Sequence, residues 1–317
     1  MLDLVKKETT MQDEPTTFPS RPRLIAVLGG TGTVGSEVMR QLSNYDCAVR
    51  GVLRAPDRTY PVAVQERPAR VGYVTSDVGS PDHLRRAFAG ADAVFLLTGT
   101  SPDQVQTETR AIEAARQAGV RRVVKLSAPV VGGSASVQVA DWHREIEERL
   151  AASGLEYCFL RPYSFMQNWL RNAHTIKHSG KIIGSAGSSP RNYVDCRDVA
   201  EIATRLLLDE KPPGFQGITL TGPEVITNQD MAGRLSLVTG SVVEYEDISR
   251  DEHYHMLLSQ AKLPEWLARH IVELEELATL IPEQPTDTVQ NLLGRYPRTM
   301  DEFLQEHRSA FLKEPAR

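Results

Sequence analysis

The fold of this chain is decided at residues 24–36, which read Leu-Ile-Ala-Val-Leu-Gly-Gly-Thr-Gly-Thr-Val-Gly-Ser. An apolar, β-branched run stops at a cluster of glycines, and a helical pattern follows over 37–42. A buried strand, a tight turn and a helix start form, in this order, the crossover that binds a dinucleotide. Gly29 can take the positive φ of the turn, Gly32 lets a pyrophosphate approach the backbone, and Gly35 lets the helix pack closely on the strand. The alternative is a glycine-rich turn that binds no ligand.

The alternation of strand and helix continues along the chain. Residues 174–195 are rich in glycine and serine and are expected to loop over the strand ends, and the pattern becomes mostly helical from Thr227. The sequence therefore predicts an α/β fold, a doubly wound parallel Rossmann-type sheet with a small, mostly helical C-terminal substrate lobe. Strands are expected at 24–28, 47–54, 71–76, 91–98, 122–127, 155–160 and 217–223, and helices at 81–88, 103–118, 137–153 and 195–208.

The chain divides into three expected parts. Residues 1–22 are polar and contain prolines, and they lack the apolar region of a signal peptide, so we expect a flexible leader. Residues 23–160 are expected to form the dinucleotide-binding Rossmann core. Residues 161–317 are expected to hold the remaining core strands and helices, interleaved with the substrate-binding lobe.

Composition excludes several classes of function. The 317 residues are 41% hydrophobic and carry a formal charge of −5, which gives no reason to expect nucleic acid as a partner. No stretch approaches the roughly 18 apolar residues of a membrane span. Cys47, Cys158 and Cys196 lack metal-like spacing, and Cys158 lies in an apolar run, so we expect core packing and a cytoplasmic, reducing compartment. His253 and His255 have no neighbouring ligand set, and no metal site is expected.

The end of the second strand indicates which dinucleotide fits. An acidic residue there would accept a hydrogen bond from the ribose 2′-hydroxyl of NAD. The chain has Arg54 at this position and Arg58 shortly after it. A guanidinium pairs with a 2′-phosphate and cannot accept from a hydroxyl, so NADP(H) is favoured; a surface arginine is the alternative.

From Leu24 to about Phe311 the chain resembles the NmrA-like branch of the atypical short-chain dehydrogenases. The resemblance implies NADP(H) in a crevice beside the sheet, with substrate under the C-terminal lobe. Many members resemble reductases of quinones or other conjugated carbonyls, and others bind the nucleotide and act as regulators. The matching motifs are Gly29–Gly35, Arg54, 76–78, 95–98, 125–128, 143–147, 153–155, 160–168, 194–195, 198–200 and 220–223. The cofactor contacts implied are Gly29, Thr31, Gly32, Thr33, Val34, Gly35, Arg54, Asp77, Val78, Leu97, Thr98 and Pro162.

The family's usual catalytic residues are incomplete here. A typical short-chain dehydrogenase has a serine after the fifth strand and a Tyr-x-x-x-Lys pair on the next helix, in which the tyrosine protonates the substrate oxygen. Ser127 occupies the serine position, whereas Val139 and His143 occupy those of tyrosine and lysine. Hydride transfer is still feasible, because a quinone or activated alkene can take its proton from water or another donor.

Several candidate site residues each have two possible roles. Tyr163 could protonate the substrate or form a wall of the nicotinamide site, and His143 could transfer a proton or contact a ribose. Asp77 could accept from an adenine amino group or cap a turn. Lys125 lies inside a strand and is expected to turn its charge to a sheet end or a polar neighbour. Phe165, Met166 and Trp169 could line a substrate pocket or pack in the core.

The leading functional hypothesis is an NADPH-dependent oxidoreductase that reduces a hydrophobic conjugated carbonyl, quinone or imine. Its catalytic candidates are Tyr163, His143 and Ser127, and its partner would be a small, hydrophobic, aromatic substrate. Two alternatives stay open, an NADP(H)-sensing regulator that binds a protein and a non-redox cyclase or isomerase. A protein partner or a homo-oligomer is compatible with all three.

Overall fold

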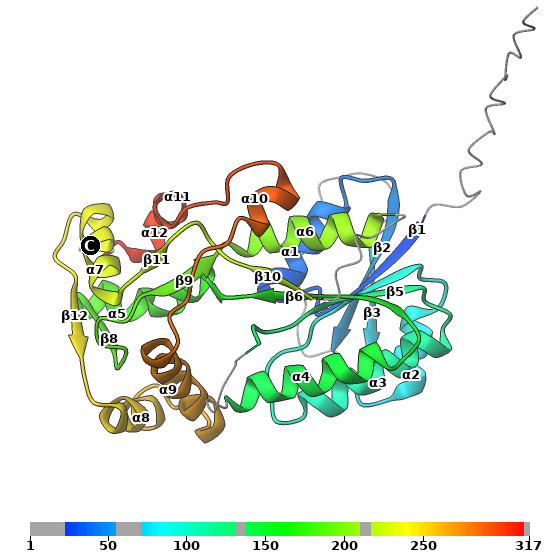
Figure 1. Cartoon of the computed structure of the whole chain (residues 1–317), viewed down its shortest axis with the longest axis horizontal. Coiled ribbons are helices and arrows are strands. Elements are labelled where there is room, and N and C mark those ends of the chain that lie inside the picture. The colour runs from blue at the N-terminus through cyan, green and yellow to red at the C-terminus, as the bar shows by residue number, and fades with distance from the viewer. Residues whose placement is uncertain (1–22, 55–70, 131–136, 210–216, 314–317) are drawn as a thin grey trace, which may run out of the picture.

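The computed structural model describes residues 23–54, 71–130, 137–209 and 217–313. Within these residues the main sheet has seven parallel strands in the order β10-β6-β5-β4-β1-β2-β3 (Figure 1). The order reverses between β1 and β4, and ligands bind at this switch point in open α/β sheets. The strands are β1 (Arg23–Leu28), β2 (Cys47–Arg54), β3 (Val71–Ser76), β4 (Ala93–Leu96), β5 (Arg122–Leu126), β6 (Glu156–Pro162) and β10 (Gly217–Leu220).

Helices cover both faces of the sheet (Figure 1). One face carries α1 (Thr33–Leu42), α6 (Cys196–Leu208) and α10 (Thr288–Leu293). The other face carries α2 (Pro81–Phe88), α3 (Gln104–Gln117) and α4 (Gln138–Ala151). A parallel sheet covered in this way is doubly wound, so the predicted fold class is confirmed.

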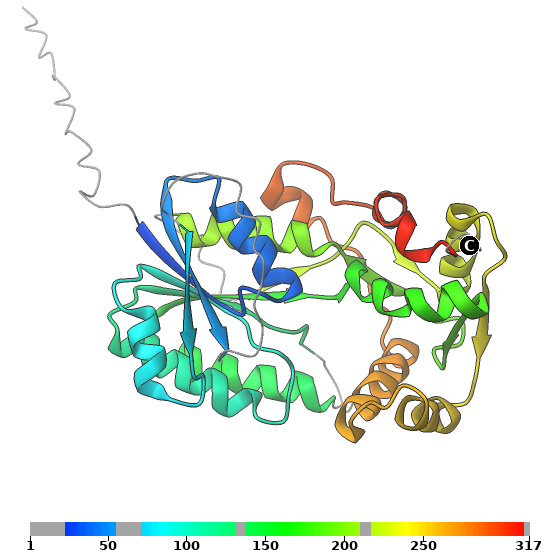
Figure 2. The same ribbon diagram turned by 180° about the vertical axis from the view of Figure 1, so that it is seen from behind.

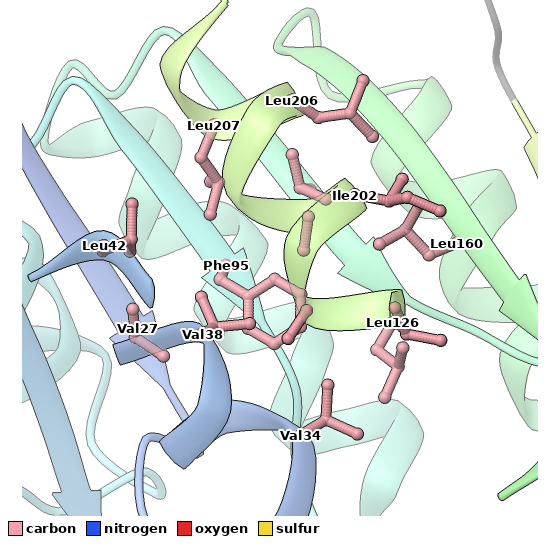
Figure 3. Packing of buried hydrophobic residues seen from close by; sticks show 14 of the residues in the cluster. Val27, Val34, Val38, Leu42, Phe95, Leu126, Leu160, Ile202, Leu206 and Leu207 are labelled. Atoms are coloured by element: carbon pink, nitrogen blue, oxygen red, sulfur yellow. The ribbon is translucent and has the colours of Figure 1, made fainter. Parts of the chain in front are cut away.

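The core explains why these segments form strands and helices. Val38 of α1, Phe95 of β4 and Ile202 of α6 are at most 1% exposed and meet in one cluster above the sheet (Figure 3). Fully burying such a side chain stabilises a fold by about 1.5–3 kcal/mol. β4 is buried along its whole length, which is the reason that its sequence reads as a continuous apolar run. β5 is equally buried but contains the charged residues Arg122 and Lys125.

A smaller lobe lies beyond the C-terminal end of β6 (Figures 1 and 2). It contains the small sheets β11-β9-β7 and β12-β8 and a separate core around Trp169, Met231 and Phe303. Its elements are β7 (Ser164–Phe165), the 3-10 helix η1 (Met166–Asn172), α5 (Ala173–Ser179), β8 (Lys181–Gly184), β9 (Arg191–Val194), β11 (Val225–Ile226), α7 (Asn228–Thr239), β12 (Glu244–Asp247), α8 (Arg250–Ser259), α9 (Glu265–Leu280), α11 (Met300–Glu306) and α12 (Arg308–Phe311).

The expectation of a loop at 174–195 is wrong. This stretch contains most of α5 and all of β8 and β9. Ile176 and Ile182 are buried in the core of the lobe, and β8 pairs with β12 some sixty residues later. Short segments like these are stabilised by partners distant in sequence, so their local composition is a poor guide to their secondary structure.

No helix in the described residues is long and apolar enough to cross a membrane.

Candidate functional site

The glycine turn after β1 has the close contacts that its sequence predicts. Gly29 has φ +82°, and its carbonyl oxygen accepts a hydrogen bond from the Gly32 N–H at 2.9 Å. A Cβ atom on Gly29 would lie 2.5 Å from the carbonyl oxygen of Leu97, and one on Gly35 would overlap the carbonyl oxygen of Gly29. The turn therefore requires glycine at positions 29 and 35.

The first turn of α1 is suited to an anion. Its N-cap is Gly32, which has no side chain to accept from the first backbone N–H groups, and the turn has no acidic residue. Helix N-terminal N–H groups and the helix dipole together favour a phosphate. Thr31 is half-buried, Thr33 is exposed and Val34 packs in the core, so Val34 can offer a ligand only its backbone.

The predicted nucleotide contacts at the ends of β2 and β3 are partly described. The backbone of Arg54 pairs with Ser76 at the end of β3, whereas the Arg54 side chain and all of Arg58 lie outside the described residues. Asp77 Oδ1 accepts from the Gly79 N–H at 2.8 Å, which supports the turn-capping reading. Val78 is half-buried and packs on the core beneath α2 and α3.

The other predicted cofactor contacts lie beside the turn or at the end of β6. The backbone of Leu97 packs against Gly29, and the neighbouring Thr98 hydroxyl donates to Glu108 Oε1 at 2.7 Å. Pro162 is buried and pairs with Leu220 of β10. Leu97 and Thr98 follow β4 on the same edge of the sheet as the glycine turn, where parallel strands end together.

A fully buried ion pair lies beneath this edge. Lys125 Nζ of β5 donates to Glu108 Oε2 of α3 at 2.6 Å, and both side chains are 0% exposed. Glu108 Oε1 also accepts from Gln104 Nε2 at 3.0 Å. Lys125 therefore turns its charge to polar neighbours, as expected. Glu108 was not predicted as a site residue, because its place in an amphipathic helix reads as an ordinary surface carboxylate.

His143 of α4 adjoins this pair. Lys125 Nζ lies 3.2 Å from His143 Nδ1. Burial, together with the positive charge of Lys125 and the neighbouring His270, holds the pKa of His143 well below its usual range. His143 is consequently neutral at physiological pH, so it can act as a hydrogen-bond donor but not as a preformed imidazolium acid.

Ser127 follows β5 at the predicted position, but its hydroxyl is engaged. Ser127 Oγ donates to Glu147 Oε1 at 2.6 Å. The Glu147 carboxylate also accepts from the Arg161 guanidinium, with Nε at 2.9 Å. A role for Ser127 as a donor to substrate would require this hydrogen bond to break.

Tyr163 lies at the junction between the sheet and the lobe. Its N–H donates to the carbonyl oxygen of Leu220 at 3.0 Å. Burial and the nearby Glu283 carboxylate raise the pKa of the phenol, so it stays protonated at neutral pH. Arg191 Nη2 of β9 lies 3.6 Å from Glu283 and donates to Ser164 Oγ at 2.8 Å.

Helix α9 brings His270, which the sequence analysis missed, to the same region. His270 of α9 is close enough to lower the pKa of His143. Burial and Arg191 in turn lower the pKa of His270 to about 4. Trp142 of α4 and Trp266 of α9 lie with ring centroids 6.3 Å apart. The sequence around His270 gives no indication that this side chain lies near His143.

The predicted substrate residues separate into two groups. Met166 and Trp169 are 1% and 4% exposed in the core of the lobe, and Trp169 packs on Tyr193 with ring centroids 5.8 Å apart. Their burial favours the core-packing reading. Phe165 is half-buried at the edge of the main core and remains a candidate substrate contact.

The remaining sequence features have structural partners. His253 Nδ1 lies 3.0 Å from Glu275 Oε2 and 3.1 Å from Ser185 Oγ. A single imidazole nitrogen faces both partners, so the three do not form a Ser-His-Glu relay, in which opposite ring nitrogens are used.

Cys47, Cys158 and Cys196 are free and buried, which confirms core packing for Cys158.

Comparisons with known proteins agree with this geometry. Residues 29–210 match a family model described as NAD(P)H-binding. The chain is 33% identical over 294 residues to the NAD(P)H azoreductase of Xenophilus azovorans, covering 91% of this chain and 99% of the relative. The NADPH complex of an NADPH-dependent quinone oxidoreductase from Escherichia coli matches with a TM-score of 0.79 at 25% identity, covering 89% and 99% of the two chains. The negative transcriptional regulator NmrA shares the fold, with a TM-score of 0.72 at 16% identity, covering 90% and 95%.

Proposed function

The chain belongs to the NAD(P)H-binding, NmrA-like family of atypical short-chain dehydrogenases, and on this basis we propose that it is an NADPH-dependent reductase of hydrophobic, planar acceptors. The acceptors would carry a conjugated carbonyl, quinone, imine or related unsaturated group. The observation that carries the proposal is the Gly29–Gly35 turn, whose close packing and uncapped α1 N-terminus fit an anion, and His143 of α4 is proposed as the hydrogen-bond donor.

The residues present fit a bound NADPH. The turn and the α1 N-terminus would hold the pyrophosphate, and Arg54 would pair with the 2′-phosphate. When bound, the dinucleotide supplies a hydride. As the acceptor gains that hydride, negative charge develops on its oxygen or nitrogen. The N–H of neutral His143 would stabilise this charge, and a proton from water would complete the reduction.

Tyr163 is proposed as a wall of the nicotinamide site that stays protonated, with Phe165 beside it. Ser127 is proposed to act mainly through Glu147 and Arg161, which would fix the backbone where β5 and β6 end. The position of the usual catalytic tyrosine is Val139, which is 7% exposed and offers no polar atom from its side chain. The reaction would therefore use acceptors that need no strong preformed acid.

The proposal is tested by titrating the purified full chain with NADPH and NADH by fluorescence, then following reduced-nicotinamide absorbance with quinones, enones and azo dyes. NADPH binding with acceptor-dependent consumption supports the reductase. Tight NADPH binding without NADPH consumption would favour the regulator or the non-redox enzyme. Absence of NADPH binding would mean that Gly29–Gly35 forms a turn that binds no nucleotide.

A further inference from the structure

We propose that Lys125 of β5 is a positioning residue that fixes His143 in the neutral tautomer with its proton on Nε2. His143 would then present one oriented N–H donor to an oxygen or nitrogen atom of the acceptor. This inference rests on the proposed reductase function and extends it to the kind of acceptor that needs the donor.

Lys125 has one N–H donor for each of its three neighbours. An ammonium group has three N–H donors and no acceptor. Lys125 Nζ has three neighbours, which are Glu108 Oε2 at 2.6 Å, the Leu126 carbonyl oxygen at 3.1 Å and His143 Nδ1 at 3.2 Å. The first two can only accept. The third N–H is therefore directed at His143 Nδ1, which must accept it through its lone pair.

Glu108 accepts hydrogen bonds at both of its carboxylate oxygens. Its two oxygens accept from Thr98 Oγ1, Gln104 Nε2 and Lys125 Nζ. Both carboxylate oxygens of Glu108 therefore serve as acceptors, and Lys125 is its cationic partner in the pair. The pair is fully buried, so its geometry is well fixed.

The second ring nitrogen of His143 is Nε2. When Nδ1 accepts, the proton of a neutral imidazole lies on Nε2. His143 Nε2 makes no hydrogen bond to any described residue, and the His143 side chain is half-buried. The charged or titratable groups that face His143 are Lys125 from β5 and His270 from α9, with Glu108 of α3 behind Lys125. Both direct neighbours disfavour an imidazolium.

The consequence is a distinction between acceptors. A quinone takes a hydride and one proton: a C–H or O–H bond forms with the hydride, and the negative charge left on oxygen is then protonated. A cationic triarylmethane dye takes the hydride alone: one C–H bond forms at the central carbon and the cation becomes neutral. Only the first reaction develops an oxyanion, so only the first needs the donor on His143.

NMR of the free full chain labelled with ¹⁵N-histidine tests the tautomer directly. His143 is assigned by the signal lost in His143→Gln, and long-range ¹H–¹⁵N correlations report which nitrogen is protonated. We expect the proton on Nε2 in the wild type, and in a Glu108→Gln/Lys125→Met double variant we expect a tautomer mixture and a higher His143 pKa. The double variant removes both charges, because Lys125→Met alone leaves a buried carboxylate unpaired and can fail to fold. Protonated Nδ1 in the wild type would overturn the proposal.

Kinetics with the two acceptors test the role. The double variant should lose at least tenfold in kcat with a quinone and stay within twofold with the cationic dye, with NADPH affinity unchanged. An equal loss with both acceptors would assign the pair a structural role only. Arg298→Met is the control, because it removes one partner of the buried Asp198 on the opposite face of the sheet and should leave the ratio of the two rates unchanged. If the wild type binds NADPH and reduces no acceptor, the proposed function fails while the NMR result still decides the tautomer.

Discussion

The carbonyl oxygen of Gly29 lies so close to Cα of Gly35 that a side chain at position 35 would overlap it. One end of α1 is thereby held against the end of β1. The same contact aims the first N–H groups of the helix at the edge of the sheet where the anion site is proposed.

Replacing Gly35 by alanine should therefore disrupt nucleotide binding. The added methyl group must push the helix start away from the turn, at a cost of about 1–3 kcal/mol as for other overpacked sites. We expect the Kd for NADPH to rise at least tenfold in a fluorescence titration, with a lower midpoint of urea unfolding. Gly72→Ala is the matched control, since a Cβ atom there meets nothing within 4 Å. An unchanged Kd for NADPH in Gly35→Ala would contradict the proposed anion site.

Arg54→Ala tests the choice between the two dinucleotides. A hydrogen bond to a charged group contributes about 1.5–3 kcal/mol, which corresponds to roughly 10- to 100-fold in affinity. The Kd for NADPH should rise by this factor while that for NADH stays within twofold. Arg40→Ala removes a surface arginine of α1 that pairs with Glu37 and should change neither. Equal weakening of both dinucleotides would assign Arg54 a structural role.

The pH profile distinguishes a neutral donor from an imidazolium acid. The pKa of His143 is lowered by burial, Lys125 and His270, so its neutral form predominates from acidic pH upwards. An imidazolium acid would lose its proton, and its activity, as pH rises. We instead expect kcat with a quinone to stay flat between about pH 5.5 and 8, a range in which an unperturbed histidine with a pKa of about 6.5 would titrate. A fall in kcat across this range, absent in His143→Gln, would contradict the neutral donor.

Trp169→Ala and Phe165→Ala separate core packing from substrate contact. Removing the buried Trp169 should destabilise the protein by about 3–5 kcal/mol, measured by urea unfolding. Removing the half-buried Phe165 should cost less stability and should raise KM for an aromatic acceptor severalfold. The reverse pattern would show that Trp169, despite its burial, contacts the acceptor.

The Asp195 carboxylate should make the free energy of unfolding depend on pH. Burial alone would raise its pKa, but hydrogen bonds from the Arg197 side chain and backbone, together with that positive charge, outweigh burial and lower it. Because the folded pKa is depressed, the stabilisation is present above the unfolded pKa of about 3.9 and is lost as pH falls below it. Asp195→Ala should cost about 2–3 kcal/mol at pH 7, from the lost N-cap of α6 and its charged hydrogen bonds.

Urea unfolding at pH 7 and pH 3 measures this linkage. The difference between wild type and Asp195→Ala should shrink at pH 3, because the Asp195 carboxyl of the unfolded chain is then largely protonated and must lose that proton on folding. Glu113→Ala is the control: it removes an exposed partner of Arg116 on α3 and should change the free energy of unfolding little at either pH. A constant difference across pH would mean that the Asp195 charge contributes nothing.

The sequence by itself determined the parts of this protein that depend on local pattern. The apolar runs of β1 and β4, the glycine turn and the amphipathic helices predict a parallel, doubly wound sheet. Strands and helices have different spacings of apolar residues, and the glycines at 29 and 35 admit no side chain. The absence of the Tyr-x-x-x-Lys pair could also be read directly at Val139 and His143.

Only the tertiary structure decided which side chains meet at the site. Lys125, Glu108 and His143 come from three elements, and their hydrogen bonds exist because β5, α3 and α4 pack together in the fold. The placement of His270 near His143, the engagement of Ser127 by Glu147 and the pairing of β8 with β12 likewise join residues far apart in the chain. Local periodicity carries no information about such contacts, because burial and pairing are set by the packing of whole elements.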